Sequence, residues 1–321
     1  MTAFAAGRTG AVGKGPWRAE YLPVPSSAPS FAAFDAWLTE ATEWAAAGAG
    51  PGWSEAFARG AMHGFVYRAP TDPVDVALCG ALAPSCDSAG RQFPLALAAP
   101  LSVSPELLQR PELLPFSLEG LWAEATGGLA DLLHLHQPPE ATAAPHLSAG
   151  HDAEVAESAH LYDEWVATLP LNELWGLLGP SLVNPGATLQ LLFETLAPSR
   201  GVERPTTTLS LRLPLGLAGG AALCFWLDVV RRYVAWRTTL PSLFWSHDGT
   251  TGAALLHLGR PSKGALAELW MPTSNRDDAA DLTRPADPAW AEAFSPLPPA
   301  VVAALSVPQA SVAQLLAAIG A

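Results

Sequence analysis

The clearest helical pattern in the chain follows a segment rich in glycine and proline. Up to about Pro29, prolines recur too often for a helix, so this segment is expected to be largely extended. Ser30 is a suitable N-cap, and apolar side chains including Trp37 then recur at three- and four-residue spacing from Phe31 to Ala41. This spacing predicts a helix with one apolar face, and we expect that face to pack against a sheet.

Three apolar runs after this helix predict β-strands at residues 64–68, 74–82 and 93–98. Turn-forming residues separate the runs. Their residues are apolar almost throughout rather than alternating with polar ones, which is typical of strands that helices cover on both faces. The sequence therefore predicts an α/β fold in which a mixed β-sheet lies between two layers of helices.

A change of composition divides the chain. Gln, Pro, Glu, Ala and Thr dominate residues 137–145, as is typical of a linker. We therefore predict an N-terminal α/β domain at residues 1–136, a proline-rich linker at residues 137–152, and a helix-rich α/β region at residues 153–321.

The C-terminal region shows helical patterns mixed with a few strand patterns. The predicted helices and strands are, in chain order, helices at residues 153–169, 171–178 and 185–197, a strand at 207–213, a helix at 221–236, strands at 242–246 and 252–258, and a helix at 262–270. Asp248 and Gly249 supply the turn between the last two strands. Residues 271–299 are predicted to be mostly loop.

Charge restricts the classes of partner. The chain has 321 residues and a formal net charge of -13, and nucleic-acid binding requires Lys and Arg to neutralise phosphates, so nucleic acid is excluded as a partner. Residues 101–200 carry thirteen acidic and only two basic residues. An acidic surface of this kind is either a solvated face or a docking surface for a basic partner.

The sequence favours a cytoplasmic protein. Its three cysteines are odd in number, which suits free thiols in a reducing compartment better than a disulfide framework. The N-terminus has no basic region followed by an apolar run, so no secretory signal is expected. The longest uncharged apolar stretch, at residues 213–227, is shorter than the roughly 20 residues that span a bilayer. We expect no membrane insertion.

Two arrangements that could bind a cofactor are incomplete. Lys14 follows a glycine, but the Walker spacing requires glycine where the chain has Arg8, and Ser or Thr where it has Gly15. His134 and His136 could share a metal ion, yet no Cys or acidic residue keeps ligand-like spacing from them. We therefore predict neither a metal site nor a cofactor.

A short polar segment between two apolar runs contains candidate nucleophiles, Ser85 and Cys86. The segment has no Gly-x-Ser-x-Gly elbow and no nearby histidine with an identifiable role. Turn-forming residues explain the segment equally well, because Gly90 supplies the positive φ that any Cβ makes costly. Arg91 could pair with Asp87, which stabilises little if the pair is exposed. The sequence therefore predicts a turn here.

The same segment resembles the central signature of a known protein family. The signature of the TagF family, also called ImpM, of type VI secretion-associated proteins reads Pro-Ser-x-Asp-x-x-Gly-Arg-x-Phe-Pro-Leu. Every fixed position is matched by the run Pro84-Ser85-Cys86-Asp87-Ser88-Ala89-Gly90-Arg91-Gln92-Phe93-Pro94-Leu95.

Three further segments are similar to elements of the TagF family. The first is the opening Gly-Lys-x-Pro-x-Arg-Gly-Asp-Phe element, which is matched at Gly13, Lys14, Pro16 and Arg18 and departs at Ala19, Glu20 and Tyr21. The departure keeps an acidic and an aromatic residue but loses a glycine. The second is a Trp-Asp-x-Trp-Leu helix, in which Phe34 replaces the first Trp and Trp37 the second. The third is a Ser-Leu-Trp-Trp strand that ends here at Trp245.

The resemblance implies an α-β-α layered fold and a cytoplasmic, post-translational repressor of type VI secretion. It also implies binding to components of that system, with the forkhead-associated scaffold protein as the expected partner. It implies no catalytic activity. On this first hypothesis, the chain presents to its partner a surface near four charged residues, Lys14, Arg18, Asp87 and Arg91.

The alternative hypothesis is a small-ligand-binding protein or hydrolytic enzyme that uses Ser85 or Cys86 with a distant histidine. Geometry separates the two hypotheses. An enzyme of this kind requires His63, His247 or His257 within hydrogen-bond reach of one of the two nucleophiles.

Overall fold

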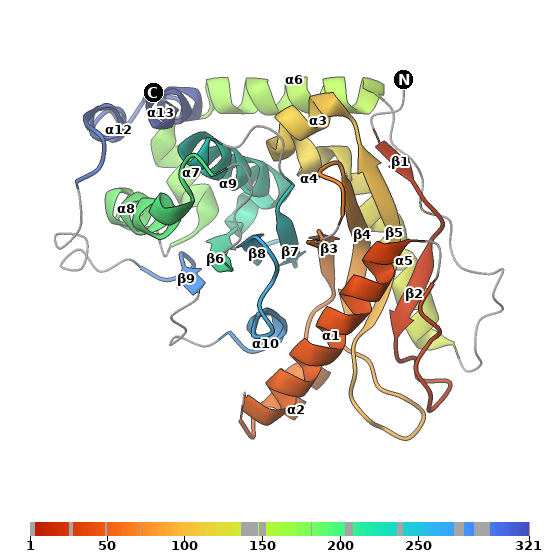
Figure 1. Cartoon of the computed structure of the whole chain (residues 1–321). Coiled ribbons are helices and arrows are strands. Elements are labelled where there is room, and N and C mark those ends of the chain that lie inside the picture. Colours follow the sequence, from red (N-terminus) through yellow and green to blue (C-terminus); the bar gives the residue numbers. More distant parts are fainter. Residues whose placement is uncertain are drawn as a thin grey trace.

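A computed structural model describes residues 4–25, 28–48, 50–70, 72–135, 147, 152–180, 182–202, 208–235, 240–272, 279–285 and 296–320. Most of the predicted linker lies outside the described residues, as do His136 and the end of the helix predicted at residues 221–236. Figure 1 shows a twisted sheet between helical layers, with the C-terminal helices gathered beside one end of the sheet.

One sheet runs through the described part of the chain. Its strands are β1 (Phe4–Ala6), β2 (Gly10–Gly13), β3 (His63–Tyr67), β4 (Val76–Ala83), β5 (Leu95–Val103), β6 (Leu209–Pro214), β7 (Ser242–His247), β8 (Gly252–Leu258) and β9 (Ala279–Asp281). Their order is β1-β5-β4-β3-β7-β8-β6-β9, and β2 also pairs with β5. The β6–β9 pair is parallel and the other pairs are antiparallel, so the sheet is mixed.

Helices cover both faces of this sheet, which confirms the predicted α-β-α layers. One face carries α1 (Pro29–Gly48), α2 (Trp53–Ala58) and α10 (Ala265–Trp270), and the other carries α5 (Glu119–His134) and α9 (Gly219–Val234). The remaining helices are α3 (Pro105–Gln109), α4 (Leu114–Ser117), α6 (Asp152–Thr168), α7 (Leu171–Leu178), α8 (Pro185–Leu196), α12 (Pro299–Leu305) and α13 (Val312–Ile319), with 3-10 turns η1 (Pro111–Leu113), η2 (Ala197–Ser199) and η3 (Gly216–Ala218).

Strand β4 shows why its sequence is apolar throughout. Successive side chains of a strand point to opposite faces. Cys79 and Ala81 accordingly lie in the core beneath α5, while Leu78 and Leu82 lie in the core beneath α1. Because each face is buried, no position on the strand favours a polar residue.

The apolar face predicted for the first helix is buried against the sheet. Phe31, Phe34, Trp37, Leu38 and Ala41 of α1 are each at most 1% exposed. Trp37 packs on a ring of β7, and its indole Nε1–H donates to the carbonyl oxygen of residue 262 at 3.1 Å. The helix therefore packs against strands from both predicted regions, β3 in the first and β7 in the second.

Two segments predicted as irregular contain strands. The extended N-terminal segment forms β1 and β2, which pair with β5 and extend that edge of the sheet. The predicted loop at residues 271–299 contributes β9, which pairs with β6. These three strands have only three or four residues each, and their main-chain hydrogen bonds to a neighbouring strand leave little trace in a hydrophobic pattern.

The two predicted regions share the sheet. β3 from the first pairs with β7 from the second, with Phe65 opposite Phe244. The boundary at residues 137–152 stays a prediction, but it does not divide two separate sheets. Among the described residues, the helices are too short or too polar to span a membrane.

Candidate functional site

Asp87 lies at the centre of the signature segment and is 2% exposed. Its Oδ2 accepts hydrogen bonds from Lys14 Nζ at 2.8 Å and from Arg91 Nε at 2.6 Å. Its Oδ1 accepts from the backbone N–H groups of Ala89 at 3.0 Å and Arg91 at 2.9 Å. The Lys14 hydrogen bond is the main reason that the pKa of Asp87 lies well below its usual value, although burial opposes the shift. The carboxylate is therefore a fixed anion.

The signature segment folds as a tight bend around this carboxylate. The backbone N–H of Asp87 donates to the carbonyl oxygen of Arg91 at 3.0 Å, and that of Gly90 donates back to Asp87 at 2.9 Å. Gly90 has φ of 78°, a conformation that side chains rarely adopt, as the sequence predicted. The bend is consequently built from backbone bonds and one buried side chain.

The N-terminal segment is bound to this bend. Gly13 has φ of 109°, and a Cβ there would lie 2.0 Å from the carbonyl oxygen of Pro94. Only glycine fits this approach, and it brings Lys14 to Asp87 across 73 positions of sequence. Arg91 Nη2 also donates to the carbonyl oxygen of Ala19 at 2.7 Å. The two motifs therefore form one structural unit.

Tyr21 covers the cluster from the solvent side. Lys14 Nζ lies 4.4 Å from the centroid of the Tyr21 ring, a cation–π contact, and that ring meets Phe93 edge-on at 4.9 Å between centroids. Arg18 donates from Nε and Nη2 to the carbonyl oxygens of Glu20 and Tyr21. The aromatic residue at position 21 thus contributes to packing, and this segment keeps an aromatic residue there although it departs from the family pattern.

The structure brings together the four residues predicted to form a partner-binding surface, but their side chains differ in exposure. Lys14 and Asp87 are buried, whereas the side chain of Arg91 is 61% exposed and Arg18 is partly exposed. Only Arg18 and Arg91 therefore present surface to another molecule. The Asp87–Arg91 pair that the sequence allowed is present, and its carboxylate is buried and shared with Lys14.

A small cavity opens beside the bend, and we call it the signature notch. It has a volume of about 400 Å³. Its walls are Pro16, residues Phe57 and Ala58 of α2, Leu133 of α5, and the bend from Pro84 to Gln92. Gln92 Nε2 donates to the carbonyl oxygen of residue 54 at 2.9 Å, which ties the bend to α2.

The candidate nucleophiles line this notch without the partner that hydrolysis requires. Ser85 Oγ contacts the carbonyl oxygen of Cys86 at 3.5 Å, and Cys86 is a free, exposed thiol. The three candidate histidines bond elsewhere: His63 to the carbonyl oxygen of Ala61, His247 to that of Gly216, and His257 to Ser210 Oγ. In the part of the chain that the structure describes, no histidine hydrogen bonds to Ser85 or Cys86.

The N-terminal part of the chain has a recognisable family. Residues 10–145 match the sequence model of the TagF N-terminal domain, described as type VI secretion system-associated. Residues 10–145 thus correspond to a TagF N-terminal domain, and we call them the TagF region. The comparison with curated proteins gives no match. The fold is similar to the crystal structure of PA0076 from Pseudomonas aeruginosa PAO1, with a TM-score of 0.46 and 16% identity over 84% of this chain and 96% of that one.

We call the contacts of Lys14 and Arg91 with Asp87 the clamp. The TagF region contains the clamp, the bend and the notch, but it does not contain Trp245. That residue lies on β7, and its ring meets Trp122 of α5 at 3.6 Å between centroids. Gly64 on β3 makes room for it, because a Cβ there would lie 2.3 Å from the Trp245 ring. The aromatic side chain thus packs the C-terminal half against the TagF region.

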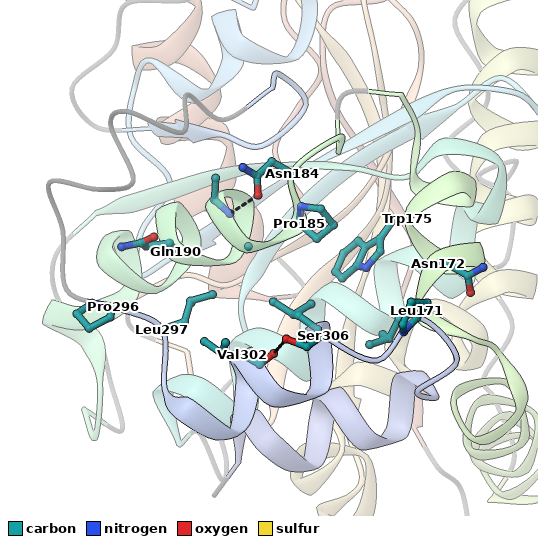
Figure 2. Close-up of a pocket in the computed structure, with 14 residues that line it drawn as sticks. Leu171, Asn172, Trp175, Asn184, Pro185, Gln190, Pro296, Leu297, Val302 and Ser306 are labelled. Carbon is teal, nitrogen blue, oxygen red and sulfur yellow. Dashed lines mark hydrogen bonds between the residues drawn. The ribbon is translucent and has the colours of Figure 1, made fainter.

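A groove larger than the notch lies beyond the TagF region. Figure 2 shows this groove between α7, α8 and the segment leading into α12, with a volume of about 900 Å³. Trp175, Leu297 and Val302 line it, and its polar groups are the amides of Asn172, Asn184 and Gln190 and the hydroxyl of Ser306. Asn184 caps α8 by accepting from the backbone N–H of Ala187 at 3.1 Å. The groove has no charged lining residue, and the sequence pattern did not indicate it.

A buried charge network joins the TagF region to the second half, and sequence reasoning missed it. Asp228 of α9 is 1% exposed and accepts from Tyr162 Oη at 3.1 Å, Arg231 Nη2 at 2.6 Å and Arg232 Nε at 2.7 Å. Arg231 Nε also lies 2.9 Å from the carboxylate of Glu112, whose pKa is raised by burial. Arg231 and Arg232 therefore lie partly buried against these carboxylates. Asp228 within an apolar run was the available signal.

Proposed function

We propose that this chain is a cytoplasmic, non-enzymatic regulator that represses a bacterial type VI secretion system after translation. It acts by binding a component of that system, and the forkhead-associated scaffold protein is the first partner to test. The match of residues 10–145 to the TagF N-terminal domain supports the assignment to type VI secretion. The repressor role and the scaffold come from the family resemblance.

The geometry of the signature supports binding over catalysis. Its one carboxylate is occupied by two cations and two backbone amides, so it has no free lone pair directed at a substrate. Among the described residues, no histidine hydrogen bonds to the hydroxyl or the thiol beside it. What the segment offers instead is a rigid bend with arginine side chains at the surface. A rigid, charged turn contributes little to folding but can orient a partner.

A secretion assay with a matched binding assay tests this proposal. Deletion of the gene should increase secretion of the system's own substrates, and expression of the intact chain should reverse the increase. The tagged intact chain should also retain the purified scaffold protein. Secretion that is unaffected by the deletion, or turnover of a substrate that stops on Ser85→Ala substitution, would contradict the proposal.

A further inference from the structure

Two arginines adjoin residues that line the signature notch: Arg91 lies between Gly90 and Gln92, and Arg18 lies two positions after Pro16. We call the notch and these two arginines the notch surface. We propose that this surface receives an acidic segment of the partner, which inserts one apolar side chain into the notch and sets its carboxylates against Arg91 and Arg18. The inference rests on the proposed function and specifies how the same site recognises its partner.

The notch has the dimensions and lining of a side-chain pocket. Its volume of about 400 Å³ is at the lower end of the roughly 300–1,000 Å³ found for ligand pockets. Prolines, Phe57, Ala58 and Leu133 make most of its walls apolar. Ala58, Cys86 and Gly90 are exposed, so the cavity opens at the surface. A cavity of this kind accepts one apolar side chain from a docked segment.

Charge at the rim selects an acidic segment. Lys14 and Arg91 share the single carboxylate of Asp87, so this cluster carries one net positive charge. Arg91 stands between Gly90 and Gln92, which both line the notch, and its side chain is 61% exposed. Arg18 follows the wall residue Pro16 and donates to backbone carbonyls.

The acidic residues near the rim leave this positive charge in place. Glu55 of α2 pairs with Arg59 at 3.0 Å, so these two charges balance each other. Arg18 and the Asp87 cluster together carry two positive charges, and Glu20 carries one negative charge, so one positive charge remains. In a chain with a net charge of -13, this local excess of cation is complementary to an acidic partner and not to a basic one.

The clamp makes the surface rigid before any partner arrives. Asp87 holds both the bend and the N-terminal segment, which both contribute residues to the lining of the notch. Arg91 is held by Asp87 and by the carbonyl oxygen of Ala19. A surface that is already ordered loses little conformational entropy on binding, which favours affinity.

Substitutions of Ala58 test the notch without touching the clamp. Ala58 is the last residue of α2, is exposed, and lines the notch. Ala58→Gln fills the cavity with a neutral side chain, and Ala58→Glu fills it with a like charge. Ala303 of α12 is also an exposed helical alanine but lines neither the notch nor the clamp, so Ala303→Gln and Ala303→Glu are matched controls.

The measurement is the dissociation constant of the intact chain for the purified scaffold protein, by calorimetry at two salt concentrations. Ala58→Gln should weaken binding several-fold and Ala58→Glu by at least about tenfold, because the added carboxylate repels the acidic segment. The Ala303 variants should bind as the parent does, and the parent should bind more weakly at higher salt. Melting temperatures of all variants confirm that they are folded.

Each outcome decides between the two proposals. If the parent binds and both Ala58 variants bind equally well, the notch is not the docking site, while the regulatory function stands. If Ala58→Glu binds no worse than Ala58→Gln, or if salt has no effect, the partner segment is not acidic. If the parent itself does not bind the scaffold, the scaffold assignment and the notch inference both fail.

Discussion

Removing the carboxylate of Asp228 should destabilise the whole chain, and the effect can be estimated from its surroundings. Asp228→Ala removes the acceptor of three hydrogen bonds in the interior, from Tyr162, Arg231 and Arg232. The Tyr162 hydroxyl, in a side chain only 1% exposed, loses its partner. The arginine side chains are 21% and 34% exposed, so water compensates them in part.

The magnitude follows from these burials. An unsatisfied buried hydroxyl costs about 1–3 kcal/mol, and breaking a buried ion pair from one side costs about 3–5 kcal/mol. Water hydrates the partly exposed arginines and so reduces the second cost. We therefore expect the free energy of unfolding of Asp228→Ala to be about 4 kcal/mol lower than that of the parent. With an m-value of about 3 kcal/mol/M, the urea midpoint should fall by about 1.3 M.

Asp163→Ala is the matched control. Asp163 also pairs with a guanidinium, through both carboxylate oxygens to Arg110 at 2.7 and 3.1 Å, but its side chain is 58% exposed. An exposed pair contributes about 0–1 kcal/mol, so this midpoint should fall by less than about 0.3 M. Both substitutions remove an aspartate that pairs with arginine, and the two carboxylates differ most in their burial.

Urea titrations followed by circular dichroism and by tryptophan fluorescence provide the test. The two signals should coincide, because β3–β7 pairing and the Glu112–Arg231 contact join the TagF region to the second half. Equal, small midpoint shifts for Asp228→Ala and Asp163→Ala would show that burial does not determine the cost. Separate transitions in the parent would show that the halves unfold independently.

Three further substitutions probe the clamp and the C-terminal helices. Asp87→Asn should be less stable than the parent at neutral pH, and this difference should shrink as the pH falls below about 4. The reason is that a carboxylate with a lowered pKa loses its stabilising effect when it is protonated. Melting temperatures that differ by a constant amount across this pH range would contradict this prediction. Gly13→Ala should lower the urea midpoint much more than Gly90→Ala. Both glycines have positive φ, but only at Gly13 would the new Cβ clash with backbone atoms. Equal midpoint shifts would contradict this prediction. Ser311→Ala removes the capping box of α13 and should cost about 1 kcal/mol in the same urea titration, whereas an unchanged midpoint would mean that the cap contributes nothing.

Periodicity predicts the helices and the central strands of this chain well. The apolar face of α1, the continuous apolar run of β4 and the Asp248 turn between β7 and β8 each reflect local packing that repeats along the sequence. Periodicity does not reveal β1, β2 or β9, because those short strands depend on hydrogen bonds to strands far away in sequence. The pairing of β3 with β7 is hidden for the same reason.

The candidate site was predicted in its residues but not in its arrangement. The turn chemistry around Gly90 and the charges of Lys14, Asp87 and Arg91 are readable in the sequence. Their roles are not, because the direction of a carboxylate, inward or outward, depends on Gly13 allowing the N-terminal segment to approach Pro94. The notch has walls from separate segments, so no single stretch of sequence contains it.

The burial of Asp87 and Asp228 affects the charge that this chain presents at its surface. Each buried carboxylate is surrounded by cations and neutral donors, so neither contributes negative charge to the surface. At Asp228 the arginine side chains are only 21% and 34% exposed, so less cationic surface remains there than at Arg91. At Asp87 the same arrangement leaves Arg91 exposed beside an apolar cavity, which distinguishes this place on a protein of strongly negative net charge. A partner that carries acidic groups would be repelled by most of the surface and attracted here, so in the proposed complex the clamp would determine both the shape and the location of the docking surface.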